Sequence, residues 1–424
     1  MSPGSCPGAP SPVAPSQVPG HTPDLLGQDV AMDPTVLRKF GSRPWRDPAT
    51  GLWVLSGYRA VRAALEDHDT FRPDNVLDAL ASLDWASKRE LAKVRFNLPP
   101  TLANNSSDSH PGLRKLASRF VGGAAASRAS ERVADLTRSA LDRLEQELDL
   151  TGSADMVEVV ARDVPSRVIL EVLGLSPVEP EQLARWTYAS LELFWGMPDA
   201  GRQLELSRAA AEFYAWICEQ LSRSRSDEGD SLAGALRAHR KPCGSRLGAA
   251  EKAATTYFLI IAGHVTVSQM LSIAFSRLVA SPSAWRELSA TPDSVGLVVE
   301  ELLRSDTPLS TWRRIVSEAV RVEGVDIPAG APVLLALGAT GHDPNTFADP
   351  GRLCPGRRDG WAHLAFGSGR HRCAGASFAR MELATVLSVA AARLPDLRIV
   401  RSPAVHWSFL SFRAPKQVLV RRGP

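Results

Sequence analysis

The sequence has few cysteines, and their spacing excludes the frameworks that cysteine-rich proteins use. Its 424 residues include 5 cysteines, which lie far apart and form no CxxC pair. An odd number at this spacing argues against a disulfide-stapled fold and against a zinc knuckle. The pattern favours a reducing compartment, so we expect a cytoplasmic protein.

Long apolar runs and a large net charge are also missing. We find no apolar run long enough to cross a membrane and no signal-peptide pattern at the start of the chain. The formal net charge is +3, which is too small to indicate a phosphate-binding surface. We therefore expect neither a membrane nor a nucleic acid as a partner.

The remaining pattern predicts a mainly α fold with a smaller β-rich portion. Residues 1–28 are rich in Pro, Gly and Ser and are predicted to be a disordered leader, followed by one catalytic domain over 29–424. Apolar periodicity predicts a long buried helix over 250–281 and other helices over 155–173, 180–223 (one or two) and 374–394. Strands are predicted at 52–55, 320–322 and 332–335, and a long irregular loop, typical of a lid or binding loop, over 73–109.

One cysteine lies in a segment that can carry chemistry. Cys373 follows two glycines, Gly367 and Gly369, and directly precedes the predicted helix over 374–394. Glycines allow a tight turn and close approach of the backbone. The partial positive charge at a helix N-terminus lowers the pKa of a thiol, which makes Cys373 a candidate metal ligand or nucleophile.

The run from Phe366 to Gly375, continuing to Ala379 and Glu382, resembles the haem-binding signature of the cytochrome P450 family. The resemblance covers about residues 30–424 and implies the cytochrome P450 fold, with haem b as the cofactor and Cys373 as the iron ligand. It also implies that Phe366, Gly367 and Gly375 contact the haem.

Other segments match the family in order. Glu301 and Arg304 resemble its ExxR motif, and residues three apart share a helix face, so the two can pair. The resemblance places Arg352 as their third partner. It also implies that four cationic side chains bind the haem propionates, because Arg and His supply hydrogen bonds that carboxylates accept: His110, Arg114, Arg314 and His371.

The centre of the long helix resembles the oxygen-binding segment of the family. Ala262 and Gly263 are small enough to pass close over a haem, and Thr266 would hold the bound oxygen or a water. An alternative is that the Thr266 hydroxyl bonds only to a carbonyl of its own helix. Val265 departs from the family, which usually has an acid or amide there, and His264 is expected to point away from the iron.

Family resemblance also suggests the surroundings of the substrate and the electron donor. The pocket is expected to be lined by the 73–109 loop, by aromatic residues of 186–198 and by further residues: Leu259, Val265, Leu309, Ser310, Phe409 and Leu410. No nucleotide-binding glycine motif is found. Electrons are therefore expected from a ferredoxin and its reductase, steered by basic residues on the cysteine side: Lys115, Arg119, Arg357, Arg358, Arg370 and Arg372.

These features predict a haem-thiolate monooxygenase that oxidises a small organic molecule with dioxygen, in specialised metabolism. The substrate is free or held on a carrier protein. Because valine cannot relay protons, Val265 keeps open a second interpretation, peroxide-driven oxidation or oxidative coupling. A haem-binding sensor without turnover is a third interpretation, which Thr266 and the apolar pocket disfavour.

Overall fold

The structure is a computed structural model and describes residues 41–223, 231–401 and 406–423, with residues 25, 33 and 35–37. The predicted leader lies outside the described residues except for Leu25. That side chain is buried at 4% exposure and belongs to a small apolar cluster with Leu37 and Leu52.

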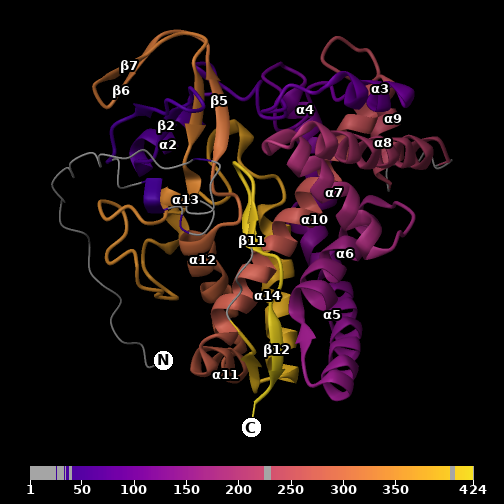
Figure 1. Ribbon diagram of the computed structural model, residues 1–424, viewed down its shortest axis with the longest axis vertical. Helices are drawn as coiled ribbons and strands as arrows, with labels where there is room; N and C mark the ends of the chain where they lie inside the picture. The colour runs from indigo at the N-terminus through magenta and orange to yellow at the C-terminus, as the bar shows by residue number, and fades with distance from the viewer. Residues whose placement is uncertain are drawn as a thin grey trace.

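Helices form most of the molecule and occupy its right side and lower part in Figure 1. The α-helices are α2 (Tyr58–Glu66), α3 (Trp85–Lys93), α4 (His110–Val121), α5 (Gly123–Thr151), α6 (Asp163–Leu173), α7 (Pro180–Trp195), α8 (Ala200–Arg223), α9 (Leu232–Ala238), α10 (Ala249–Val279), α11 (Pro282–Ala290), α12 (Val295–Asp306), α13 (Leu337–Thr340) and α14 (Ala376–Arg393). The shorter helices are the π-helix η2 (Val157–Arg162) and the 3-10 turns η3 (Pro292–Ser294), η4 (Gly360–Ala362) and η5 (Gly369–His371).

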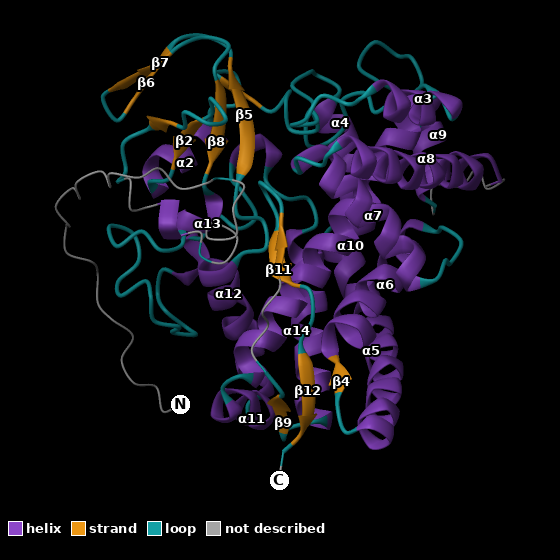
Figure 2. Cartoon of the chain, in the orientation of Figure 1, coloured by secondary structure: helices purple, strands orange, loops and turns teal. Residues whose placement is uncertain are grey.

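Short strands gather mainly at the upper left of Figure 2, beside the helical part. They are β1 (Trp45–Arg46), β2 (Trp53–Leu55), β3 (Phe71–Arg72), β4 (Ala154–Asp155), β5 (Trp312–Val316), β6 (Val320–Val322), β7 (Val325–Ile327), β8 (Pro332–Leu335), β9 (Leu397–Ile399), β10 (His406–Ser408), β11 (Arg413–Pro415) and β12 (Leu419–Arg422). The largest sheet has the order β1-β2-β8-β5-β3, in which only the β2–β8 pair is parallel. A second sheet has the order β4-β12-β9.

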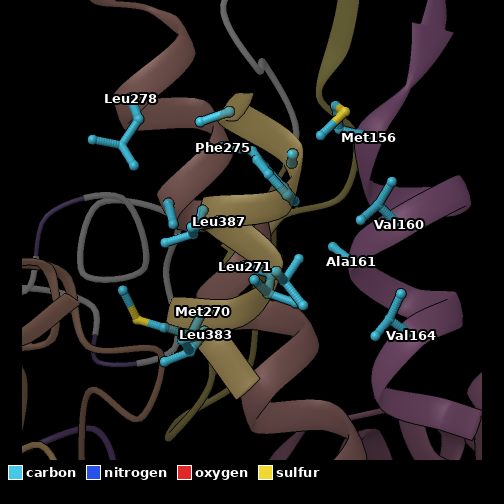
Figure 3. Packing of buried hydrophobic residues seen from close by; sticks show 14 of the residues in the cluster. Met156, Val160, Ala161, Val164, Met270, Leu271, Phe275, Leu278, Leu383 and Leu387 are labelled. Atoms are coloured by element: carbon cyan, nitrogen blue, oxygen red, sulfur yellow. The ribbon is translucent and has the colours of Figure 1, made fainter. Parts of the chain in front are cut away.

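Helix α10 is the core of the helical part and contributes to both large apolar clusters. It is long and apolar enough to cross a membrane, but 78% of its most apolar window is buried inside the protein. Figure 3 shows its side chains Met270, Leu271 and Phe275 meeting those of α14 and of the η2–α6 segment. Burial on all sides explains why its sequence is apolar nearly all round.

The predicted elements agree with the structure only in part. The segment 73–109, predicted to be an irregular loop, contains the helix α3 (Trp85–Lys93). The helix expected over 155–173 is interrupted, since residues 154–155 form β4 and the π-helix η2 precedes α6. The helix after Cys373 begins at Ala376 and not at Ala374. Cys354 is disulfide-bonded, which the cysteine spacing did not predict, while Cys218, Cys243 and Cys373 are free.

Candidate active site

The segment around Cys373 is a turn whose shape depends on glycine. Gly367 and Gly369 both have φ +68°, a conformation that side chains other than glycine rarely adopt. A Cβ atom on Gly369 would lie 2.7 Å from the backbone oxygen of Leu65 in α2. The amide of Cys373 donates to the carbonyl of Phe366 at 2.8 Å, which closes the turn. The backbone therefore presents Cys373 in a fixed position.

The Cys373 side chain is a free thiol on an accessible residue. Although the residue is accessible, the surrounding protein atoms desolvate the thiol, and this raises its pKa above the usual value. A hydrogen bond with the backbone of Gly375 and the charges of Arg114 and Arg372 act in the opposite direction. The expectation that a helix start lowers this pKa was wrong, because α14 begins three residues later and desolvation dominates.

One stripe of α10 is left partly open. Between residues 253 and 275, the side chains that are not fully buried are Phe258, Ala262, Gly263 and Thr266. Phe258, Ala262 and Thr266 are spaced four apart and therefore share one face of the helix. The Thr266 hydroxyl donates to the carbonyl of Ala262 at 2.7 Å, which is the alternative raised from the sequence.

Gly263 was predicted to let α10 pass close over a haem, but in the structure it contacts α6. A Cβ atom at this position would lie 2.4 Å from Cδ1 of Ile169 in α6. The missing side chain of Gly263 therefore lets α10 pack closely against α6. The open face of α10 is defined by Ala262 and Thr266.

The cysteine turn and α10 are neighbours through both apolar clusters. Phe366 packs on the cluster that contains Met270 and Leu271 of α10. Ala374 packs on the cluster that contains Ile261 and Val265. The turn and the open stripe of α10 thus border the same interior region.

Basic side chains collect beside the cysteine turn, and none of them forms an ion pair with an acidic residue in the described part of the chain. The rings of His110 and His371 are 4.3 Å apart, and Arg370 Nε donates to His110 Nδ1 at 3.4 Å. Burial, reinforced by neighbouring positive charge, lowers the pKa of His110 to about 4 and that of His371 to about 3. Burial lowers the pKa of Arg314 to about 10, and Arg314 is one of the charges acting on His371.

Within the described residues, this cationic cluster leaves donors unused. His371 Nδ1 contacts the carbonyl of Leu102 at 3.2 Å, but its Nε2 atom is buried without a partner. Arg314, at 2% exposure, donates to the carbonyl of Arg313 and forms no ion pair in the described part of the chain. Buried cations are normally paired, so this arrangement indicates that an anionic group belongs here.

Glu301 of α12 forms a buried ion triad that differs from the predicted one. Arg304 donates to Glu301 through Nε at 2.9 Å and Nη2 at 2.7 Å. The third member is Arg357, whose Nε and Nη2 donate to the same carboxylate at 2.9 and 3.0 Å. The prediction of Arg352 was wrong, because its exposed side chain is not in the triad and only its carbonyl accepts from Arg304 and Arg357.

A second buried carboxylate, Glu300, ties the cysteine turn to α12 and α14. Glu300 Oε2 contacts His363 Nε2 at 3.0 Å and accepts from Arg380 Nη2 at 2.9 Å. The Arg380 guanidinium lies 4.5 Å from the ring centre of Phe366 in the turn. Sequence reasoning missed this link, because its members are far apart in the chain.

Comparison with known proteins identifies the family. The sequence model described as Cytochrome P450 matches residues 294–390. The chain is 31% identical over 386 residues to the cytochrome P450 monooxygenase PikC of Streptomyces venezuelae, covering 89% of this chain and 88% of that protein. It belongs to the cytochrome P450 family.

Other relatives agree with this identification. The mycinamicin IV hydroxylase/epoxidase of Micromonospora griseorubida is 30% identical, with 84% of this chain and 85% of that protein covered. The solved P450 heme domain of Tepidiphilus thermophilus superimposes with a TM-score of 0.87 at 27% identity, covering 94% of this chain and 96% of that one. The protein is an oxidoreductase of the monooxygenase type, and its cofactor is haem.

The arrangement of residues fits haem. Cys373 supplies a free thiol on an accessible residue, as an iron ligand must. The unpartnered Nε2 atom of His371 and the unpaired Arg314 are suited to two propionate carboxylates, with His110 and Arg114 beside them. Phe366, Gly367 and Gly375 hold the turn in place, and Ala262 leaves room on the opposite side.

A pocket lies next to the open stripe of α10. The residues of α10 that line it differ from those predicted. It is lined by Leu77, Leu98, Thr101, Phe194, Trp195, Ala254, Tyr257, Phe258 and Ile261. The 73–109 loop and the aromatic segment near 194 thus contribute as expected. Leu259 and Val265 do not, because they are 5% and 0% exposed and pack in the core.

The two remaining predicted segments lie at the edge of this region. Leu309 forms a bridge with Phe412, and Leu410 donates its amide to the carbonyl of Trp195 at 3.0 Å. Leu309 and Phe409 are partly open and pack on the same apolar cluster as Trp195. Ser310 is buried, and its amide is used in a bond to Ser411 at 2.9 Å.

Proposed function

We propose that the protein oxidises a small organic molecule of specialised metabolism with dioxygen and electrons from a ferredoxin and its reductase. The observation that carries this proposal is the open stripe of α10 with Thr266, which borders the same interior as Cys373 and adjoins an apolar pocket. Relatives named as PikC monooxygenase and as mycinamicin IV hydroxylase/epoxidase support it.

In this proposal, Cys373, Thr266 and the pocket residues have separate roles. Cys373 binds the iron, and haem, when bound, supplies the oxidising chemistry. The Thr266 hydroxyl donates a hydrogen bond to the carbonyl of Ala262, so its oxygen remains free to accept a hydrogen bond and to hold a water in the site. The pocket around Phe258 and Ile261 orients the substrate and excludes bulk water.

Proton supply in this proposal does not come from the residues next to Thr266. Val265 is fully buried in an apolar cluster. His264 is turned toward α7, where its Nδ1 lies 3.1 Å from Thr187 Oγ1, and burial lowers its pKa to about 3. Ordered water or a group on the substrate then carries the protons.

A basic surface supports the choice of an acidic electron donor. Lys115, Arg119, Arg358 and Arg372 are exposed on segments around the cysteine turn, and Arg370 is half-buried there. Positive charge of this kind accelerates association with an acidic protein such as a ferredoxin. Arg357 was wrongly included in this surface, because it is 5% exposed and belongs to the Glu301 triad. A donor of this kind, and a substrate that is free or held on a carrier protein, support the proposal that the protein acts in the cytoplasm.

The test compares Thr266→Ala with Thr255→Ala. Thr255 is a matched control on α10, because its hydroxyl also donates to a carbonyl of its own helix, that of Glu251 at 2.7 Å, but it lies away from the open stripe. Haem-loaded enzyme with ferredoxin, reductase and a fractionated metabolite extract should form a product. Thr266→Ala should form less product per electron pair consumed, and Thr255→Ala should match the unaltered enzyme. Equal yields in all three would contradict the proposed role of Thr266.

Val265 favours a second candidate function, peroxide-driven oxidation or oxidative coupling. It predicts product from peroxide alone at a rate at least equal to that with ferredoxin and dioxygen. Isotope-labelled dioxygen separates the candidates, because monooxygenation places one labelled oxygen atom in the product and oxidative coupling places none. An unlabelled, coupled product would replace the first proposal by the second.

A further inference from the structure

Two adjacent arginines of β5 have different surroundings, and only one is accounted for by the haem site. Arg314 belongs to the cationic cluster beside Cys373. Arg313 is 3% exposed, and its Nη2 donates to the carbonyls of Val76 at 2.6 Å and Phe194 at 3.5 Å. Its Nε atom is buried without an acceptor among the described residues.

The guanidinium of Arg313 lies directly behind residues that line the pocket. Phe194 and Trp195 line that pocket, and Val76 is followed by Leu77, which lines it too. The Arg313 guanidinium carbon is 6.0 Å from the centre of the Trp195 ring. A cation thus stands behind side chains that are otherwise apolar.

Two pocket residues also carry donors without acceptors in the described part of the chain. These are the buried Nε1 atom of Trp195 and the buried Oγ1 atom of Thr101. A buried donor without a partner costs about 1–3 kcal/mol, so native proteins rarely leave several in one place. A ligand that brings acceptor oxygens would explain all three unpartnered donors, those of Arg313, Trp195 and Thr101.

The charge of Arg313 narrows the chemistry of that ligand. No carboxylate forms an ion pair with Arg313 in the described part of the chain, and the exposed Asp78 acts on it only at longer range. Burial lowers its pKa to about 10, so it stays charged at neutral pH. Arginine presents paired donors whose geometry matches a carboxylate.

We propose that Arg313 recognises a carboxylate on the substrate, and that the substrate is an apolar, ring-bearing carboxylic acid. This inference deepens the proposed function, on which it rests, by naming the substrate class of the same pocket. The aromatic walls formed by Phe194, Trp195 and Phe258 bind the apolar body. Arg313 exchanges its long bond to the Phe194 carbonyl for a charge-assisted bond to the acid.

The exchange also couples binding to the opening of the pocket. Val76 belongs to the 73–109 loop and Phe194 to the end of α7, and Arg313 ties both to β5. A carboxylate that replaces the Phe194 carbonyl as acceptor releases the end of α7 from β5, while the bond to Val76 remains. An apolar ester of the same shape cannot compete for the donors in this way.

The experiment measures binding of matched acids and esters to the haem-loaded protein. The probes are phenylalkanoic acids from phenylacetic to phenyloctanoic acid, each paired with its methyl ester, titrated by calorimetry while the haem spectrum is recorded. We expect at least one acid to bind about tenfold or more tighter than its ester, the range of a hydrogen bond to a charged group. In Arg313→Gln this preference should vanish while the ester affinity stays within about twofold.

Two further variants separate recognition from a merely structural role. Arg313→Lys keeps the charge and should retain part of the preference for the acid. Arg321→Gln, on the exposed hairpin β6–β7, should leave it unchanged. A preference that persists in Arg313→Gln, or acids that bind no tighter than esters to the unaltered protein, would overturn the inference. Equal weakening of acid and ester in Arg313→Gln would overturn it as well.

The haem spectrum distinguishes failure of this inference from failure of the proposed function. A thiolate-haem spectrum with no acid preference removes only the role of Arg313. A spectrum without thiolate ligation removes the proposed function itself.

Discussion

Two buried clusters of charge lie on the cysteine side of the molecule, and they are built on opposite principles. In the Glu301 triad, two guanidiniums meet one carboxylate and several backbone carbonyls, so every charge has a partner inside the protein. In the cluster of His110, His371 and Arg314, two imidazole rings kept neutral by burial lie beside a guanidinium, and no carboxylate of the described residues pairs with them. The first cluster holds the fold together, whereas the second is completed by a ligand.

Breaking the Glu301 triad should have the largest effect on the free energy of unfolding. Glu301→Gln removes the negative charge that pairs with both Arg304 and Arg357, whose side chains are 0% and 3% exposed. Removing one partner of a buried ion pair typically costs about 3–5 kcal/mol. Urea unfolding of the haem-free protein should show a loss in this range. A loss below about 1 kcal/mol would mean that water enters the triad and that the comparison fails.

Removing a charge from the unsatisfied cluster should act on the ligand and not on the fold. In Arg314→Gln, the haem-free protein should be as stable as the unaltered one or more stable, because a buried unpaired cation is lost. Haem transfer to an acceptor protein should become about tenfold faster, as expected for one lost charge-assisted bond. The comparison would be contradicted if Arg314→Gln destabilised the haem-free protein as strongly as Glu301→Gln.

The cluster of His110, His371 and Arg314 should make the stability of the protein depend on pH below neutrality. The folded pKa of His110 is about 4, while the ordinary value is 6.5, so the unfolded chain binds more protons between these values. Stability of the haem-free protein should therefore fall as the pH is lowered from about 6.5 toward 4. Bound propionates stabilise the protonated ring, so haem-loaded protein should show a shallower slope in thermal melts. His110→Gln should show a shallower slope without haem, and an unchanged slope would rule out His110 as its source.

The smallest predicted change in stability is that of an Arg352 variant, and the matching Arg357 variant is its control. Arg352→Ala should change the free energy of unfolding by less than about 0.5 kcal/mol, because only its main-chain carbonyl is used. Arg357→Ala should cost about 3 kcal/mol, since Glu301 keeps Arg304. Chemical denaturation of both variants measures the difference, and the reverse order would restore Arg352 to the triad.

The same pair shows how far the sequence alone can lead. The cysteine turn and the spacing of Glu301 and Arg304 predict their own local structure, because each depends on neighbours in the chain. Arg352 and Arg357 both lie in an irregular segment, where no periodicity tells which side chain turns inward. Gly356, with φ +84°, sets the turn that buries Arg357, and this angle is not encoded by spacing.

Helix phase limited the prediction of the pocket in a similar way. On α10, Leu259 and Val265 were expected beside the substrate, but Phe258 and Ile261 line the pocket. A helix that is apolar on all sides gives no amphipathic signal for its orientation. The stripe of partly open residues ending at Thr266 becomes visible only when the neighbouring helices are in place.

Helix α12 places two consecutive carboxylates, Glu300 and Glu301, under two different parts of the following chain. Glu301 binds the segment that contains Cys354 and Arg357, and Glu300 binds His363 and Arg380. Residues one apart on a helix point about 100° away from each other. A single inserted or deleted residue within α12 would therefore misdirect both carboxylates at once. Length variation in this part of the protein should be tolerated before Val295, and not between Val295 and Glu301.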